Sequence, residues 1–283
     1  MSVPVAVMDG PLSLVTPADA ASALAACLGP QASAFATEWI ACCASSNTEL
    51  LDRPPSTDDR IEVLVTDRQT AGRGRRGRQW QSWPEGSLTF SLRWRFPAGG
   101  PAPAGLSLVV GLALAQGLQA LGVDGLQLKW PNDVLVQGEK IAGILIELVS
   151  SRQRGNAAVI GIGLNLRLPA DVRIPDQPGV TDLAHALDGP LPGRPALLAT
   201  LLLELQRLLT RYAGDGFPML RRDWEHYNAF ADLPVQIRSE AGVVTGVCAG
   251  VDDDGALLLR NEQGLQRVLA GEVSLRAWNG ADR

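Results

Sequence analysis

Hydrophobic and polar positions recur with two different spacings, one typical of strands and one typical of helices. Segments of the two kinds alternate along the chain. Strand-like spacing is found in five runs, at residues 61–66, 88–96, 126–130, 141–149 and 158–166. Helical spacing is found at 106–121 and at 196–212, where the leucines fall on one face. Another helix is predicted to begin near Asn47, in a cluster of capping residues at 45–48. Strands and helices that alternate in this way predict an α/β (α+β) domain built on a mixed sheet.

The segments on either side of this pattern set the expected domain limits. Residues 1–35 are rich in Ala, Pro, Ser and Leu and are predicted to form an N-terminal extension with one weak helix at 17–28. After residue 230, four short β-type runs separated by turn residues predict a small all-β barrel. We therefore expect a main domain at 36–230 and a C-terminal domain at 231–283. Within the main domain, residues 167–195 are rich in Pro, Asp and Gly and are expected to form a long loop.

Composition narrows the class of protein. The 283 residues suffice to bury a core without disulfides or metal ions. Hydrophobic residues make up 46% and charged residues 19%, which excludes a disordered chain, and no apolar run reaches the 18 residues of a membrane helix. The net charge of −5 argues against a protein whose main task is to coat phosphate backbones.

The distribution of basic residues and cysteines excludes further classes. No lysine or arginine precedes Arg53, whereas secretory signals, transit peptides and DNA-reading modules all need basic residues. We therefore expect a cytoplasmic protein that binds neither membrane nor DNA. Cys27, Cys42, Cys43 and Cys248 form no C-x-x-C pair and, with only two histidines, give no zinc-site spacing. They are predicted to be reduced, mostly packed thiols.

A loop rich in glycine and arginine occupies residues 72–78, between a predicted strand and Trp80. Glycine lets the backbone approach a ligand closely, and arginine offers planar, bidentate donors to phosphate or carboxylate. The loop therefore predicts an anion site. A solvated basic loop or an RGG-type nucleic-acid tract is the alternative. It is less favoured, because the tract is not repeated and lies inside a structured region of an acidic chain.

The sequence Lys-Trp-Pro-Asn-Asp at 129–133 ends one predicted strand and begins a turn, a place where α/β sheets commonly bind ligands. Lys129 and Lys140 are the only lysines in the sequence, which indicates a need for compact ammonium groups at these positions. An ordinary surface lysine is the alternative. Asp133 is either a turn former or a carboxylate that holds Lys129 or Mg²⁺.

Two predicted strands carry glycines that permit close approach, at 143–147, which also contains Glu147, and at 161–165. The Gly-x-Gly pair in the second strand lacks the third glycine and the following helix of a dinucleotide fingerprint, which excludes a Rossmann site. Motifs of the types G-x-S-x-G and H-E-x-x-H are absent, so hydrolase and zinc-protease functions have no support.

Taken in order, these segments resemble the biotin protein ligases over residues 45–276. The matching segments are 45–48, 69–80, 129–133, 140–147, 161–165, 224–228 and 271–276. The resemblance implies a catalytic domain of the biotinyl/lipoyl ligase fold, related to class II aminoacyl-tRNA synthetases, followed by an SH3-like barrel. Bifunctional members carry an N-terminal winged helix, for which the first 35 residues are too short and too poor in basic residues. The monofunctional form, without DNA binding, is therefore expected.

The resemblance also implies the reaction. In this family the carboxylate of biotin attacks the α-phosphate of ATP, pyrophosphate leaves, and a lysine of a biotin carboxyl carrier protein attacks the resulting biotinyl-5′-AMP. ATP and Mg²⁺ are thus the expected cofactors, biotin is the substrate, and the carrier protein is the partner. A homodimer is compatible with the resemblance.

Roles for individual residues follow from the same resemblance. Arg73 and Arg75 would clamp the biotin carboxylate and the α-phosphate, and Lys129 would bridge the two as the main catalytic group. The implied biotin site comprises Ser45, Ser46, Asn47, Gln69, Gly72, Arg73, Gly74, Arg75, Lys129 and Gly143. The implied adenylate site comprises Arg75, Arg78, Trp80, Lys129, Asn132 and Asn165. Mg²⁺ would be held through the ATP phosphates, near Asn132 or Asp133.

Other aromatic residues and the loop at 167–182 complete the expectations. Trp80 and Trp130 are candidates for apolar walls or adenine stacking, whereas Trp224 and Trp278 are expected in the core or at a domain interface. The loop at 167–182 departs from the family pattern because it contains three prolines but no tryptophan.

Two other functions stay open. A lipoate or octanoate ligase would share the fold and the carrier-lysine chemistry, but the arginine-rich loop and the C-terminal barrel weigh against it. A non-catalytic regulator that binds biotin or nucleic acid would show salt-sensitive oligonucleotide binding and no release of pyrophosphate.

Overall fold

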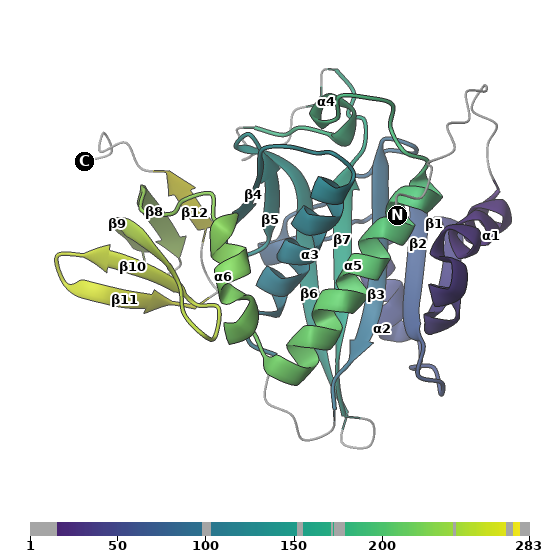
Figure 1. Cartoon of the computed structure of the whole chain (residues 1–283), viewed down its shortest axis with the longest axis horizontal. Helices are drawn as coiled ribbons and strands as arrows, with labels where there is room; N and C mark the ends of the chain where they lie inside the picture. Colours follow the sequence, from purple (N-terminus) through teal and green to yellow (C-terminus); the bar gives the residue numbers. More distant parts are fainter. Residues whose placement is uncertain are drawn as a thin grey trace.

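A seven-stranded mixed sheet forms the centre of the molecule (Figure 1). The computed structural model describes residues 16–97, 103–151, 155–170, 172, 179–239, 242–269 and 274–277. The strand order is β1-β2-β3-β7-β6-β5-β4, in which β1 and β2 are parallel and the other neighbours antiparallel. The strands are β1 (Phe35–Cys43), β2 (Ile61–Gln69), β3 (Ser87–Arg95), β4 (Leu126–Lys129), β5 (Asp133–Val136), β6 (Glu139–Ser151) and β7 (Gly155–Asn165).

The helices divide between the two faces of this sheet. In Figure 1, α3 (Leu106–Ala120) and α5 (Arg194–Asp215) lie across one face. Alternate strand residues such as Val63 and Val65 pack into the main core on that face. The intervening Leu64 instead packs with Leu50 of α2 (Ser46–Asp52) in a second, smaller cluster. Because successive side chains of a strand point to opposite faces, α2 covers the face away from α3 and α5.

The predicted helix at the N-terminus is present as α1 (Pro17–Leu28). The hydroxyl of Thr16 accepts a hydrogen bond from the Asp19 N–H at 3.2 Å, and a proline fills the first helical position. Three residues spaced four apart, Ala20, Leu24 and Leu28, are buried in the main core, and α1 contacts both α5 and β1. This helix is therefore an integral part of the packed domain. The domain limits expected at 35/36 and 230/231 stay predictions.

The predicted strands and long helices are confirmed, and five other strands and α-helices were not predicted. They are β1, β5, α4 (Leu183–Ala186), α6 (Pro218–His226) and β12 (Ser274–Ala277). The expected loop at 167–195 thus contains one helical turn, which the side chain of Asp182 caps by accepting from the His185 N–H at 3.0 Å. β5, α4 and β12 have only four residues each, which is too short to show a period.

The C-terminal residues form a separate antiparallel sheet, as predicted, with order β11-β10-β9-β8-β12. Its other strands are β8 (Pro234–Ser239), β9 (Gly242–Val251), β10 (Leu257–Asn261) and β11 (Gly264–Val268). Figure 1 shows α6 between this sheet and the main domain. The indole N–H of Trp130 donates to the carbonyl of Gly255 at 3.1 Å, and Glu225 of α6 accepts from the Val251 N–H at 2.7 Å. These contacts fix the small domain beside the turn after β4.

Candidate functional site

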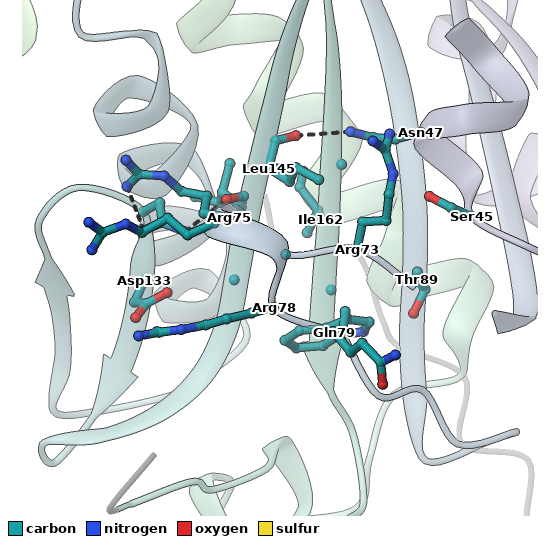
Figure 2. A pocket seen from close by; sticks show the side chains of 18 of the residues that line it. Ser45, Asn47, Arg73, Arg75, Arg78, Gln79, Thr89, Asp133, Leu145 and Ile162 are labelled. Carbon is teal, nitrogen blue, oxygen red and sulfur yellow. Dashed lines mark hydrogen bonds between the residues drawn. The ribbon is translucent and has the colours of Figure 1, made fainter. Parts of the chain in front are cut away.

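A cavity opens on the α2 face of the sheet, between the loop at 72–78 and the turn that joins β4 to β5 (Figure 2). Most of the predicted site residues line it. They are Ser45, Ser46, Asn47, Gln69, Arg73, Gly74, Arg75, Arg78, Trp80, Lys129, Asn132 and Gly143. Gly72 and Asn165 are absent from this lining. The folded chain therefore brings together segments more than 90 residues apart in the sequence.

Gly72 and Asn165 support the site from outside the cavity. A side chain at Gly72 would begin only 2.4 Å from the carbonyl oxygen of Trp80, so glycine is needed where these two backbones meet. Asn165 is buried and donates from its amide nitrogen to the carbonyl of Thr181 at 3.0 Å. It thereby ties the end of β7 to the last residues of the loop at 167–182. Two prolines of that loop, Pro175 and Pro178, lie outside the described residues.

The Gly/Arg loop folds into a small hairpin. Arg73 forms a β-bridge with Gln79, and the Gly74 N–H donates to the Arg78 carbonyl at 2.7 Å. At its tip Arg76 has φ 60° and Gly77 has φ 72°, the left-handed backbone needed to reverse the chain. The hairpin sends its arginines in different directions, and Figure 2 shows Arg73 and Arg75 on opposite sides of the cavity.

One end of the cavity is a neutral, buried hydrogen-bond network. The Ser46 backbone N–H donates to the side-chain oxygen of Gln69 at 2.7 Å. The hydroxyl of Ser91 lies 2.7 Å from the Ser46 hydroxyl and 2.6 Å from the amide oxygen of Asn47. The Asn47 amide nitrogen donates to the Leu145 carbonyl at 3.2 Å and to Glu147 at 2.9 Å. Such fixed donors and acceptors suit a neutral polar ligand group.

Arg73 belongs to this end of the cavity. Its guanidinium forms an ion pair with Glu147, the carboxylate that also accepts from Asn47. About 41% of the Arg73 side chain is exposed, so the pair sits at the rim and not in the dry interior. Arg73 therefore reaches the network through Glu147, while its position at the rim leaves it close to an entering anion.

The opposite end of the cavity is cationic. Arg75, Arg76, Arg78, Lys129 and Lys140 all line it. Arg75 donates to the side-chain oxygen of Asn132 at 3.1 Å, and the Asn132 amide donates to the Ile144 carbonyl at 2.9 Å. Burial lowers the pKa of the Arg75 guanidinium, and the nearby Asp133 carboxylate partly offsets this shift. Arginine still keeps its charge at neutral pH, so this end presents several cations to a ligand.

Lys140 is the partner of Asp133. The ammonium group lies 2.8 Å from the Asp133 carboxylate and 5.9 Å from the centre of a Trp80 ring. Asp133 had been expected either to form a turn or to hold Lys129 or Mg²⁺. Asp133 begins β5, and its carboxylate already forms an ion pair with Lys140 of the neighbouring strand β6. Lys140 and Lys129, the two lysines of the sequence, both line the cavity.

Between the two ends the floor consists of glycines. Gly143 on β6 pairs with Gly163 on β7, and Gly163 pairs in turn with Thr89 on β3. An added Cβ at Gly163 would lie 2.2 Å from the Trp80 ring, and one at Gly161 would lie 2.3 Å from the Asn47 amide oxygen. Side chains at these positions are excluded, because the residues above them already rest on the backbone. This is the physical reason for the Gly-x-Gly pattern in β7.

Trp130 does not serve as a stacking surface. Its side chain is only 1% exposed, and its indole N–H is bonded to Gly255. Trp130 is among the residues that line the cavity, so of its two expected roles the apolar wall fits, whereas stacking on adenine does not, because almost none of the ring is exposed. Trp80 does lie in the cavity wall. Trp224 is a core residue, as expected, and Trp278 lies outside the described residues.

The cysteines and metal-binding side chains agree only in part with expectation. All four thiols are free, but Cys27 and Cys42 are exposed, so the prediction that most are packed is wrong. Cys42 is exposed on β1, which is an edge strand of the sheet. In the part of the chain that the structure describes, no three His, Cys, Asp or Glu side chains gather into a metal site. No helix among those residues is long and apolar enough to span a membrane.

Sequence reasoning missed several residues of the cavity wall, among them Gln79, Thr89, Leu145 and Ile162. Thr89 carried a usable signal. In the apolar strand β3 the polar residues Ser87, Thr89 and Ser91 fall at every second position, which places their side chains on the same face as the network.

Comparison with known proteins gives a consistent result. Residues 39–165 match the Biotin/lipoate A/B protein ligase family, and residues 234–276 match the Biotin protein ligase C terminal domain. The chain is 38% identical to a biotin–[acetyl-CoA-carboxylase] ligase of Paracoccus denitrificans, over 81% of this chain and 96% of that protein. It is 35% identical to the bifunctional ligase/repressor BirA of Escherichia coli, over 82% of this chain and 72% of that protein.

Solved structures agree with these relatives. A biotin protein ligase from Aquifex aeolicus, determined in complex with biotin and ATP, superimposes with a TM-score of 0.73 at 29% identity. The superposition covers 86% of this chain and 99% of the other. Both the main domain and the C-terminal domain therefore have counterparts among the relatives.

Proposed function

The chain belongs to the biotin protein ligase family, and we propose from this premise that the cavity binds biotin at its neutral end and ATP at its cationic end. The chain is a ligase that activates biotin with ATP as biotinyl-5′-AMP and transfers the biotinyl group to a biotin carboxyl carrier protein. The assignment of individual residues below is our own.

The observation that supports this placement most strongly is the division of one cavity into two chemical halves. The buried network of Ser46, Asn47 and Gln69 offers both donors and acceptors, which the ureido ring of biotin needs when it leaves water. A dithiolane ring or an alkyl chain offers this network neither donor nor acceptor, and each hydrogen bond to water that it displaces without replacement costs about 1–3 kcal/mol. The neutral end therefore favours biotin over lipoate and octanoate.

At the cationic end, the carboxylate of biotin meets the α-phosphate of ATP. We assign Arg75 and Lys129 to these two anionic groups, with Arg78 nearer the triphosphate. Arg73 is paired with Glu147 at the other end, so it would reach the carboxylate only by leaving that partner. Attack of the carboxylate oxygen on the α-phosphorus forms the anhydride, and pyrophosphate leaves with its electron pair. Negative charge builds up on the phosphoryl oxygens in this step. Cations already fixed by partners such as Asn132 stabilise that charge without reorganisation.

Magnesium fits this arrangement in a limited way. Mg²⁺ is usually held by one or two carboxylates together with substrate phosphates and water. Asp133 supplies a carboxylate to the cavity wall and Asn132 an amide oxygen, but the first is paired with Lys140 and the second accepts from Arg75. These two residues would hold the ion only with the help of the ATP phosphates. When bound, Mg²⁺ would neutralise charge on the departing pyrophosphate.

In the second step the amine of the carrier lysine attacks the carbonyl carbon of biotinyl-5′-AMP. An amide bond forms, AMP leaves, and the amine loses a proton. We propose that the reaction runs in the cytoplasm and without DNA binding, which the net charge of −5 supports. The homodimer stays a prediction, which a mass measurement in solution tests.

ATP–pyrophosphate exchange tests the proposed function without a carrier protein. The purified chain is supplied with Mg²⁺ and, in parallel, with biotin, lipoate or octanoate. Exchange that depends on biotin is the expected result. Exchange with lipoate or octanoate instead would move the chain to the sister activity, and no exchange from folded protein would contradict an adenylating enzyme.

A further inference from the structure

Thr89 on β3 presents a buried hydroxyl that has no partner in the described structure. The side chain lines the cavity, the residue is only 4% exposed, and its Oγ1 atom is fully buried. The hydroxyls on either side of it along the strand are engaged. Ser91 belongs to the network described above, and the Ser87 hydroxyl accepts from the Trp83 N–H at 3.1 Å. Because buried polar groups are almost always hydrogen-bonded, Thr89 calls for a partner from within the cavity.

The neighbouring threonine shows that burial alone does not explain this. Thr66 on β2 pairs directly with Thr89, so the two side chains share one face of the sheet. Thr66 is equally buried, at 1% exposed, but its hydroxyl donates to the Arg68 carbonyl at 2.9 Å and it does not line the cavity. Of this adjacent pair, the threonine that faces the ligand space is the one left without a partner.

The position of Thr89 lies between the two ends of the cavity. It is two residues from Ser91, about 6.6 Å along the strand, and therefore beyond the network that receives the ureido ring. It pairs with Gly163, over which the Trp80 indole rests. The Trp80 Nε1 atom is also buried without a partner. Two unused donors thus stand at the middle of the cavity, short of the cationic end.

The part of biotin that reaches this middle position is its thioether. With the ureido ring held at one end and the carboxylate at the other, the sulfur-containing ring spans the glycine floor. A thioether sulfur accepts hydrogen bonds weakly, which suits a hydroxyl donor on a largely apolar wall. We propose that Thr89 is a specificity-determining residue whose hydroxyl donates a hydrogen bond to the sulfur of bound biotin. This inference rests on the proposed function.

A comparison of biotin with dethiobiotin tests the assignment. Dethiobiotin keeps the ureido ring and the carboxylate but has no sulfur. In ATP–pyrophosphate exchange, Thr89→Val should raise the KM for biotin about threefold to tenfold, the range for one neutral hydrogen bond, and leave the KM for dethiobiotin unchanged. Thr89→Ser, which restores the hydroxyl, should keep the wild-type ratio of the two KM values.

Thr66→Val is the matched control, because it removes a buried hydroxyl from the adjacent position. It should lower thermal stability and leave the ratio of the two KM values as in the wild type. Equal rises in KM for both acids in Thr89→Val would place the hydroxyl on a group that they share, and would overturn the proposal. So would an unchanged KM for both, or equal KM values for the two acids in the wild-type enzyme. Failure of the proposed function is seen separately, as absence of biotin-dependent exchange in the wild type.

Discussion

Substitution of Gly163 by alanine measures how tightly Trp80 closes the floor of the cavity. The new methyl group would lie 2.2 Å from Cε2, 2.4 Å from Cζ2 and 2.7 Å from Nε1 of the indole. Carbon atoms in contact keep about 3.5–4.0 Å, so the ring must move by about 1.3 Å or more. The backbone of Trp80 cannot follow, because its N–H donates to the Gly72 carbonyl at 3.0 Å. The side chain must therefore swing away from the floor.

The expected magnitude follows from the cost of overpacking. Inserting one methyl group into a packed site costs about 1–3 kcal/mol. If the added methyl group destabilises the biotin-binding form of the cavity by this amount, the KM for biotin in ATP–pyrophosphate exchange rises about 5-fold to 150-fold. Thermal stability should change little, because the strain is relieved at the cavity wall and not in the main core.

Two further variants make this prediction specific. Gly111→Ala on α3 is the matched control, since an added Cβ there meets Leu128 at an ordinary 3.4 Å, and its KM should stay at the wild-type value. In a Trp80→Ala background, Gly163→Ala should have no further effect, because the clashing ring is gone. A wild-type KM in folded Gly163→Ala protein would refute the reasoning that Trp80 must rest on the floor for biotin to bind.

Three other predictions address catalysis, pH dependence and domain docking. Lys129→Ala should lower the rate of biotin-dependent exchange about 100-fold to 1000-fold with unchanged thermal unfolding, as for loss of a donor to developing charge; near-normal exchange would remove Lys129 from its role. Burial raises the pKa of the Cys248 thiol, so the unfolded chain releases this proton first and stability falls as the pH rises past the ordinary thiol pKa. Cys248→Ala should flatten that alkaline decline in thermal unfolding, and an unchanged slope would exclude the thiol as its source. Trp130→Phe leaves the Gly255 carbonyl without its donor and should lower the free energy of unfolding by about 1–3 kcal/mol in denaturant titration; equal stability would show that this bond does not help to hold the C-terminal domain.

The elements that the sequence predicted well are those whose pattern is local. A strand such as β3 or a leucine-faced helix such as α5 is recognisable from its spacing alone. Helix α2 begins where residues 45–48 predicted, although Ser45 makes no side-chain capping hydrogen bond. The Gly/Arg loop was informative for the same reason, because four arginines within seven residues converge on an anion in almost any fold. These features also carried the resemblance to the family.

What the sequence could not supply depends on long-range register. Asp133 meets Lys140 because β5 and β6 pair with a shift between Val134 and Leu135, which no local pattern records. Trp130 lines the cavity together with Lys129 and Asn132, and from the sequence its ring looked available for stacking. Its ring is buried by a turn of the C-terminal domain, 125 residues further along the chain. Contacts of this kind can be identified only from the folded structure, in which the two domains are in contact.

Strand parity explains how one sheet serves both stability and chemistry. On β7, Ile160 and Leu164 belong to the main core beneath α3 and α5. The alternate positions of the same strand, Gly161 and Gly163, form the floor under Asn47 and Trp80. Polar and glycine residues on the cavity face bury little apolar surface, so the opposite face must supply most of the hydrophobic stabilisation. Substitutions on the cavity face should therefore alter KM far more than stability, whereas those at Trp130 or Cys248 should do the reverse.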